Sequence, residues 1–182
     1  VMGVDCARFG DDQSVIASRQ GLLVHPLKKF RQIDTMTLAG LVAQEIELRQ
    51  PAVVFVDQGG LGAGVVDRLH QVGYHMVIGV DFGGSALNKA LYLNKRTEIW
   101  CLMRDWLKTQ PHLPDDSDLK DDLTGPEYSF TGDKGQIALE KKSDMKKRGL
   151  ASPDCGDATA LTFTMPVAPT NMMGAAGNKK AI

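Results

Sequence analysis

The chain has 182 residues, of which 43% are hydrophobic and 24% charged, and its formal net charge is −1. This composition is ordinary for a globular protein and excludes wholesale disorder, and the balanced charge gives no overall sign of a nucleic-acid-binding protein. The longest apolar runs are four or five residues, too short to cross a bilayer, so no membrane association is expected. The three cysteines form no CxxC pair, which argues against a disulfide framework or a zinc ribbon.

The first thirty residues are predicted to form a three-stranded antiparallel meander. Residues 1–7 read as a buried strand ended by a Gly/Asp turn at residues 8–12. Residues 14–19 and 22–30 are two further strand-like runs, joined by the hairpin signal Gln20-Gly21. Because the chain starts directly in a strand, without an initiator Met or a signal peptide, we expect it to be a domain of a longer protein that is not secreted.

The middle of the chain changes to alternating helices and strands. A helix is predicted from Thr35, as its cap, to Pro51, and a second helix over residues 62–72. Between them, residues 52–56 form a continuous β-branched run typical of a strand buried on both faces, and residues 76–80 form another short strand. Right-handed crossovers should make the first, fourth and fifth strands parallel.

The second half is predicted to be mostly helix and loop. A helix is expected over residues 96–108, a polar loop over 110–126, and a hairpin from the strands 128–130 and 136–139. Ser152 and Pro153 have the residue types of an N-cap and first position of a last helix, running to about residue 164. We therefore predict an α/β fold with a mixed five-stranded sheet and flanking helices over residues 1–167, and a flexible tail over 168–182.

Two aspartates interrupt or end apolar strands in this scheme. Asp5 lies within the first strand and Asp57 directly follows the fourth. A buried, isolated carboxylate costs a large desolvation energy, and ligand sites of open α/β sheets lie beyond the carboxyl ends of parallel strands. Each aspartate alone is explained as a turn or helix cap. Together, at the same edge, they repel each other unless a cation lies between them.

The last predicted helix adds two more carboxylates. Asp154 and Asp157 fall on the same helical stripe as Ala158 and Leu161, the stripe that must face the sheet. Acidic residues in a first helical turn are also favoured by the helix dipole, but such residues normally point to water. Carboxylates from three distant segments at one sheet edge predict a site for a hard cation, Mg²⁺ or Mn²⁺.

Two opposite charge runs precede this helix. Residues 115–122 have a net charge of −4 and residues 141–148 a net charge of +4. Such runs are usually solvated faces, but the basic run brings five cations close to the predicted metal site: Lys141, Lys142, Lys146, Lys147 and Arg148. The glycines at residues 59–64 match neither phosphate-loop pattern and are interpreted as a tight turn before a helix.

Three segments together resemble the nuclease domain of large terminase subunits, the DNA-packaging motors of tailed bacteriophages. These are GVDCARFGDDQS at residues 3–14, VD with GGLGAGVVDRL at 56–69, and SPDCGDA at 152–158. The resemblance covers residues 1 to about 167. It implies a ribonuclease H-like fold and an endonuclease that cuts concatemeric viral double-stranded DNA with two Mg²⁺ or Mn²⁺ ions. It also implies a separate N-terminal ATPase domain in the same polypeptide. Because this chain has no Walker A motif, we expect it to be the nuclease half alone.

Site residues follow from this resemblance position by position. Asp5 and Asp57 match the first two acidic metal ligands, and the third falls on Asp154, with Asp157 next in line as an accessory ligand or an orienter of the site. Asp11 matches an acidic position near the site in some members. The implied partners are DNA, the small terminase subunit and the portal protein of the procapsid, in the host cytoplasm during virion assembly and not as a component of the finished particle.

Mechanistically, two cations about 3.5–4 Å apart activate a water molecule and stabilise the charge that develops on a phosphodiester. DNA would be held through its backbone, and we expect the five basic residues to be part of its track. A resolvase- or transposase-type nuclease fits the carboxylates equally well, and a non-catalytic docking module with a structural cation is a further alternative. An actin-like or sugar-kinase ATPase shares the sheet but needs two duplicated domains, which 182 residues cannot hold.

Overall fold

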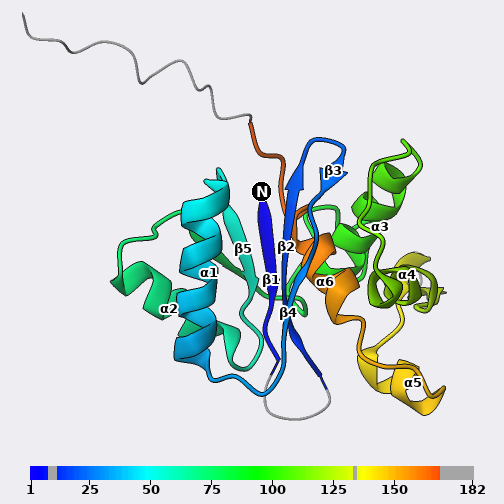
Figure 1. Ribbon diagram of the computed structural model, residues 1–182. Coiled ribbons are helices and arrows are strands. Elements are labelled where there is room, and N and C mark those ends of the chain that lie inside the picture. Colours follow the sequence, from blue (N-terminus) through cyan, green and yellow to red (C-terminus); the bar gives the residue numbers. More distant parts are fainter. Residues whose placement is uncertain (8–11, 133–134, 169–182) are drawn as a thin grey trace, which may run out of the picture.

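The protein is described by a computed structural model that covers residues 1–7, 12–132 and 135–168. Its centre is a six-stranded mixed sheet in the order β3-β2-β1-β5-β6, with β4 also paired to β2 (Figure 1). The strands are β1 (Met2–Asp5), β2 (Ser14–Gln20), β3 (Leu23–Val24), β4 (Lys28–Phe30), β5 (Val54–Asp57) and β6 (Val77–Val80). The predicted α/β class with antiparallel strands followed by parallel ones is confirmed.

The parallel half of the sheet places three strand ends at one edge. β1 pairs with β5 and β5 pairs with β6, both parallel, whereas β2 is antiparallel to β1. The carboxyl ends of β1, β5 and β6 therefore meet at the same edge, as the crossover argument predicts. Asp5 is the last residue of β1 and Asp57 the last of β5.

The predicted third strand over residues 22–30 is wrong as a single strand. It is divided into β3, where Val24 pairs with Arg19, and β4, where Lys28 pairs with Ile16. Pro26 lies in the gap, and a proline has no N–H with which to continue the ladder. The sheet consequently has six strands instead of five.

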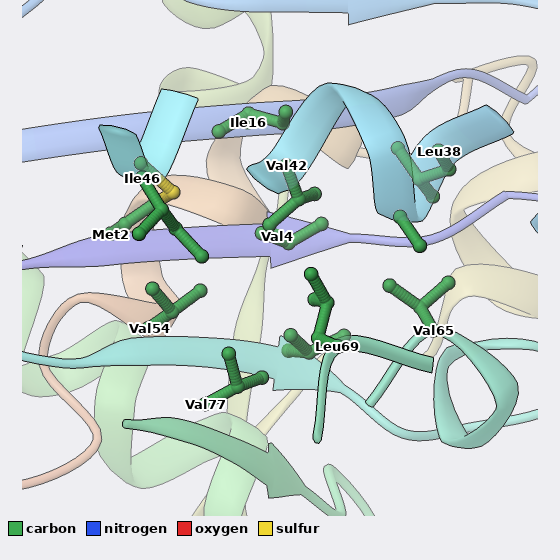
Figure 2. Close-up of a cluster of buried hydrophobic side chains, with 12 residues drawn as sticks. Met2, Val4, Ile16, Leu38, Val42, Ile46, Val54, Val65, Leu69 and Val77 are labelled. Atoms are coloured by element: carbon green, nitrogen blue, oxygen red, sulfur yellow. The ribbon is translucent and has the colours of Figure 1, made fainter. Parts of the chain in front are cut away.

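Helices cover both faces of the sheet (Figure 1). On one face, α1 (Thr35–Arg49) and α2 (Gly62–Gln71) enclose an apolar core of side chains that include Met2, Val4 and Leu69 (Figure 2). On the other face, α6 (Asp154–Leu161) lies against β1 and β2, with α3 (Lys95–Leu107) and α4 (Ser117–Thr124) around it. Since both faces are covered, β1 and β5 are buried and lack a polar side, as the continuous apolar runs predict.

Close contact between α6 and β1 depends on Gly3. A Cβ at this position would clash with the carbonyl oxygen of Ala158 in α6. Because a glycine lets the helix backbone approach the strand directly, the first turn of α6 is held beside the end of β1. This contact positions the two aspartates of that turn.

Several predicted boundaries need correction. Asp34, and not Thr35, is the N-cap of α1, because its Oδ1 accepts the amide N–H groups of Met36 and Thr37, both at 2.9 Å. Ser152 does not cap α6, whose N-cap position is Pro153 without a side-chain hydrogen bond. The helix ends at Leu161, three residues earlier than expected.

Two short helices lie where the sequence analysis places none. α4 falls inside the predicted loop 110–126, and α5 (Lys142–Lys147) falls inside the basic run. Each buries a single residue, Leu119 and Met145 respectively, so neither has the apolar periodicity that reveals longer helices. The hairpin of β7 (Tyr128–Thr131) and β8 (Gln136–Leu139) is confirmed.

No helix among the described residues has both the length and the apolar character needed to cross a membrane. Asp11 and the tail beyond residue 168, both named in the sequence analysis, lie outside the described residues.

Candidate metal centre

Three of the predicted site residues converge on one point at the carboxyl edge of the sheet. Asp5 ends β1, and Asp154 and Asp157 lie in the first turn of α6, which packs on that strand. All three are buried, with exposures of 2%, 4% and 0%. The structure thus brings carboxylates from two distant segments, β1 and the first turn of α6, together at this edge.

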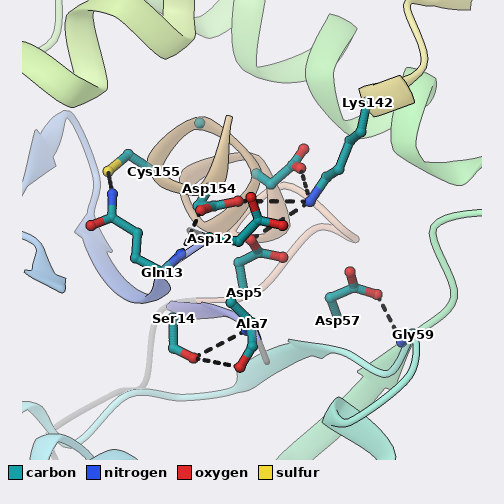
Figure 3. Close-up of polar contacts among 12 residues, drawn as sticks. Asp5, Ala7, Asp12, Gln13, Ser14, Asp57, Gly59, Lys142, Asp154 and Cys155 are labelled. Carbon is teal, nitrogen blue, oxygen red and sulfur yellow. Dashed lines mark hydrogen bonds and ion pairs between the residues drawn. The ribbon is translucent and has the colours of Figure 1, made fainter. Parts of the chain in front are cut away.

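The point of convergence is the ammonium group of Lys142, the first residue of α5 (Figure 3). Its Nζ lies 2.9 Å from Asp157 Oδ2, 3.8 Å from Asp5 Oδ2 and 4.0 Å from Asp154 Oδ1. Lys142 thus contacts all three carboxylates, and Arg96 forms a second ion pair with Asp157. Lys142 was predicted as part of a DNA track, and the structure places it inside the acidic centre.

The second carboxylate oxygens of the two α6 aspartates are held by donors of the protein. Asp154 Oδ2 accepts the backbone N–H of Gln13 at 2.9 Å. Asp157 Oδ1 accepts two hydrogen bonds from α3, from Arg96 Nε at 2.9 Å and from Trp100 Nε1 at 2.7 Å. Each aspartate of α6 therefore has one oxygen held by a donor and the other directed at Lys142, so their orientation is set before any ligand binds.

Asp57 lies beside this group at the end of the neighbouring strand (Figure 3). Its Oδ1 accepts the N–H of Gly59 at 3.0 Å, which closes the turn into α2. Among the described residues, no three of these aspartates bring ligand oxygens within 4.8 Å of one another. In this structure no three of the four carboxylates are therefore close enough to ligate a single ion together, and Lys142 lies among Asp5, Asp154 and Asp157.

Burial raises the pKa values of the four aspartates, and nearby positive charges lower them. Burial raises the pKa of Asp5 well above its usual range, and burial also raises the pKa of Asp57 and Asp154. For Asp157, burial raises the pKa too, but Arg96 and Lys142 outweigh it and the net pKa is lowered. Asp157 is therefore the carboxylate that stays ionised most readily without a metal.

Asp122 of α4 is a site residue that the sequence analysis missed. Its Oδ2 accepts the N–H of Cys155 at 2.8 Å and of Gly156 at 3.1 Å, and so caps the start of α6 from outside the helix. Burial raises the pKa of Asp122 to about 7. It belongs to the acidic run predicted as a solvated face, and only the docking of α4 on α6 reveals its role.

Arg96 and Trp100 are two further site residues that the sequence analysis missed. Their only sequence signal is their spacing along a helix, which is a weak one. They lie four residues apart and therefore on one face of α3. Arg96 additionally donates from Nη1 to the carbonyl oxygen of Glu140 at 2.9 Å, and its guanidinium lies 5.7 Å from the ring centre of Trp100. These contacts join α3, α6 and the chain after β8 around Asp157.

Most of the predicted DNA-binding cations are paired with carboxylates. Lys146 contacts Asp12 at 3.3 Å, and Lys147 contacts Asp144 at 2.7 Å. Arg148 forms ion pairs with Glu127 and Glu140. The side chain of Lys141 is exposed and has no ion pair or hydrogen bond within the described part of the chain.

A second acidic group lies near Cys155. Ligand atoms of Asp116, Asp118 and Cys155 lie within 4.8 Å of one another. However, Lys29 Nζ contacts both carboxylates, at 2.7 and 2.8 Å, and burial raises the pKa of the Cys155 thiol to about 12. These residues are explained as an ion-paired cluster that ties β4 to α4.

Comparisons with known proteins identify structural neighbours of the whole described region. The nuclease domain of the large terminase subunit gp2 of bacterial virus Sf6 matches with a TM-score of 0.74 and 18% identity, over 92% of this chain and 88% of that chain. A variant of that domain with manganese and beta-thujaplicinol matches with the same TM-score and 17% identity, over 92% of this chain and 88% of that chain. The large terminase nuclease from thermophilic phage G20c, with bound magnesium, gives 0.62 and 19%, over 90% and 79%. No protein-family model and no curated protein sequence matches the chain. The fold is thus that of terminase nuclease domains, as the sequence resemblance implies.

Proposed function

We propose that this chain is the nuclease domain of a large terminase subunit and that it cuts double-stranded DNA in a divalent-metal-dependent reaction. The observation that carries this proposal is the convergence of Asp5 Oδ2, Asp154 Oδ1 and Asp157 Oδ2 within 4.0 Å of one ammonium nitrogen, at the carboxyl edge of the sheet. The neighbours of the same fold are nuclease domains, some with manganese or magnesium, which supports the assignment.

The residues present fit hard cations. Asp5, Asp57, Asp154 and Asp157 offer only carboxylate oxygens, the donors that Mg²⁺ and Mn²⁺ prefer. Three of them already surround a positive charge. Bound cations would supply an activated water molecule and stabilise negative charge on the phosphate. We propose Asp5, Asp57 and Asp154 as the principal ligands, Asp157 as an accessory one, and Asp11 as an acidic residue near the site.

The surrounding residues prepare this centre in three ways. Gln13 fixes Asp154 through its backbone N–H, and Arg96 with Trp100 fixes Asp157. Without metal, Lys142 and Arg96 offset part of the negative charge of the centre, which lets the carboxylates remain close together. Metal binding then requires this side chain to withdraw, and it has room to do so because it is 36% exposed.

In the cell, we propose that the domain resolves concatemeric viral DNA during packaging, with two metal ions. Its partners would be an N-terminal ATPase domain of the same polypeptide, the small terminase subunit and the procapsid portal, in the cytoplasm of the bacterial host. Lys141, Lys146, Lys147 and Arg148 would contact the DNA backbone, and the ion pairs of the last three would exchange for phosphates.

The experiment is metal-dependent nicking of supercoiled plasmid by the purified chain. Mn²⁺ and Mg²⁺ should support nicking and EDTA should abolish it, while Asp5→Ala and Asp57→Asn should lower the rate by on the order of 10³-fold or more because the cations lose a ligand. Asp67→Asn is the matched control, since Asp67 is exposed on α2.

Folding is checked by circular dichroism, and Mn²⁺ binding by calorimetry. Mn²⁺ binding without any cleavage would contradict the nuclease assignment and favour a non-catalytic docking module. Cleavage confined to branched DNA would favour a resolvase-type enzyme.

A further inference from the structure

A cleft of about 390 Å³ lies directly beside the candidate metal centre. Asp57 and Lys142 form its wall on the metal side, and Asp81, which follows β6 as Asp57 ends β5, forms part of another wall. The rest of the lining includes Gly83, Arg96 and Lys141. Resting on the proposed nuclease function, we propose that this cleft holds the nucleotide next to the phosphodiester that is cut.

The lining of the cleft carries charges of both signs. Its cations are Lys141, which is exposed, and Arg96 and Lys142, which also contact Asp157, and its carboxylates are Asp57 and Asp81. Asp57 is a proposed metal ligand, so its charge would be balanced on the metal side. The cleft also includes Asn94, the N-cap of the 13-residue helix α3, whose positive dipole end therefore faces it. This lining suits a chain of phosphates.

The cations of the basic run differ in whether a carboxylate already binds them. Carboxylates pair with the three cations at the end of α5 and directly after it, Lys146, Lys147 and Arg148. Lys141, by contrast, is exposed, lines the cleft and makes no ion pair within the described residues. Within the basic run, Lys141 is thus the cation most readily available to a DNA strand that passes from the metal centre through the cleft.

Gly83 contributes no side chain to the lining of the cleft. Gly83 lies in the turn after β6, where Asp81 Oδ1 accepts its N–H at 2.9 Å. A Cβ on Gly83 would meet only Asp81 Oδ1, at 3.4 Å, and its φ lies outside the left-handed region. A larger side chain is therefore tolerated by the backbone and would extend into the cleft. The absence of a side chain at Gly83 keeps the cleft open.

The test fills the cleft without touching the metal ligands. Gly83→Leu is compared with Gly40→Leu, because Gly40 is exposed on α1 and a Cβ there meets nothing within 4 Å. DNA binding is measured by fluorescence anisotropy of a labelled duplex in Ca²⁺, and cleavage by plasmid nicking in Mn²⁺. Bis(p-nitrophenyl) phosphate, a diester without neighbouring nucleotides, reports on the metal centre alone.

We expect Gly83→Leu to weaken DNA binding and nicking by on the order of tenfold, the equivalent of about 1.4 kcal/mol. Hydrolysis of bis(p-nitrophenyl) phosphate should stay within about twofold of the wild type, a change worth about 0.4 kcal/mol. Lys141→Ala should also weaken DNA binding and lower the slope of log K against log salt by about one. Lys108→Ala, which removes an exposed cation that is paired with Asp105 and lies outside the basic run, should do neither.

DNA binding and nicking by Gly83→Leu at wild-type levels would overturn the proposal, and so would equal losses on DNA and on bis(p-nitrophenyl) phosphate, which indicate damage to the metal centre. A wild-type protein that hydrolyses neither substrate would instead contradict the proposed function. The anisotropy measurement still tests the cleft in that case.

Discussion

Replacing Lys142 with methionine tests whether its ammonium stands in for a cation. Lys142→Met keeps an aliphatic chain of similar length and removes the only positive charge recorded in contact with both Asp5 and Asp157 within the described structure. Asp5 and Asp154 then lose the cation that they contact, and Asp157 keeps the cation Arg96, at 2.9 Å, so the free energy of unfolding should fall in the absence of metal.

The magnitude follows from the exposure of the pair. The side chain of Asp157 is fully buried, whereas that of Lys142 is 36% exposed. Breaking a buried pair costs about 3–5 kcal/mol, and an exposed pair contributes about 0–1 kcal/mol, so we expect an intermediate loss of about 2 kcal/mol at pH 8 in EDTA. For a domain of this size that corresponds to a fall in Tm of about 4–8 °C.

Thermal unfolding followed by circular dichroism, with EDTA or Mn²⁺, measures this effect. Because Mn²⁺ replaces the missing charge, the Mn²⁺-induced rise in Tm should be larger for Lys142→Met than for the wild type. The control Lys147→Met removes an exposed lysine at 2.7 Å from Asp144 and should change the stability by less than about 1 kcal/mol. Equal Tm values in EDTA, together with equal Mn²⁺ shifts, would refute the reasoning.

Two further predictions concern the start of α6. The pKa of Asp122 is raised from its ordinary value of 3.8 to about 7, so the folded protein binds more protons than the unfolded chain between these values, and this group makes stability fall as pH rises from about 4 to about 7. Asp122→Asn should flatten that part of the Tm–pH curve, because it removes the titrating group and keeps an acceptor for α6. Asp122→Ala should lower the free energy of unfolding by about 1–3 kcal/mol and weaken Mn²⁺ binding in calorimetry. An unchanged slope in the Asn variant would contradict this. Gly156→Ala places a Cβ 2.6 Å from Trp100 Cη2, so urea unfolding should show a loss of about 1–3 kcal/mol. The control Gly64→Ala, in open space on α2, should be neutral or stabilising, and equal losses at both positions would point to a general helix effect.

The sequence predicts the parallel half of the fold because its signals are local. The apolar run at residues 52–56 and the carboxylates that end two strands are enough to place Asp5 and Asp57 at one edge. The inward position of Asp157 also follows from helical spacing alone, and its 0% exposure confirms that interpretation.

The remaining features arise from packing between distant segments. Lys142 belongs to a run of cations that reads as a solvated face, and only the docking of α5 brings it to the aspartates. Asp122 is likewise one of several adjacent acids, and nothing local distinguishes it from Asp121. The break at Pro26 was visible in the sequence, since a proline interrupts a ladder, but the surrounding strand-like residues outweighed it in the prediction.

The bond from the Gln13 amide to the Asp154 carboxylate joins residues 141 positions apart. As the chain leaves the ribosome, β1 and β5 emerge long before α6. A partly synthesised polypeptide therefore carries Asp5 and Asp57 of the candidate metal centre but lacks Asp154 and Asp157. Cleavage capacity on this proposal is the last property the domain acquires during translation.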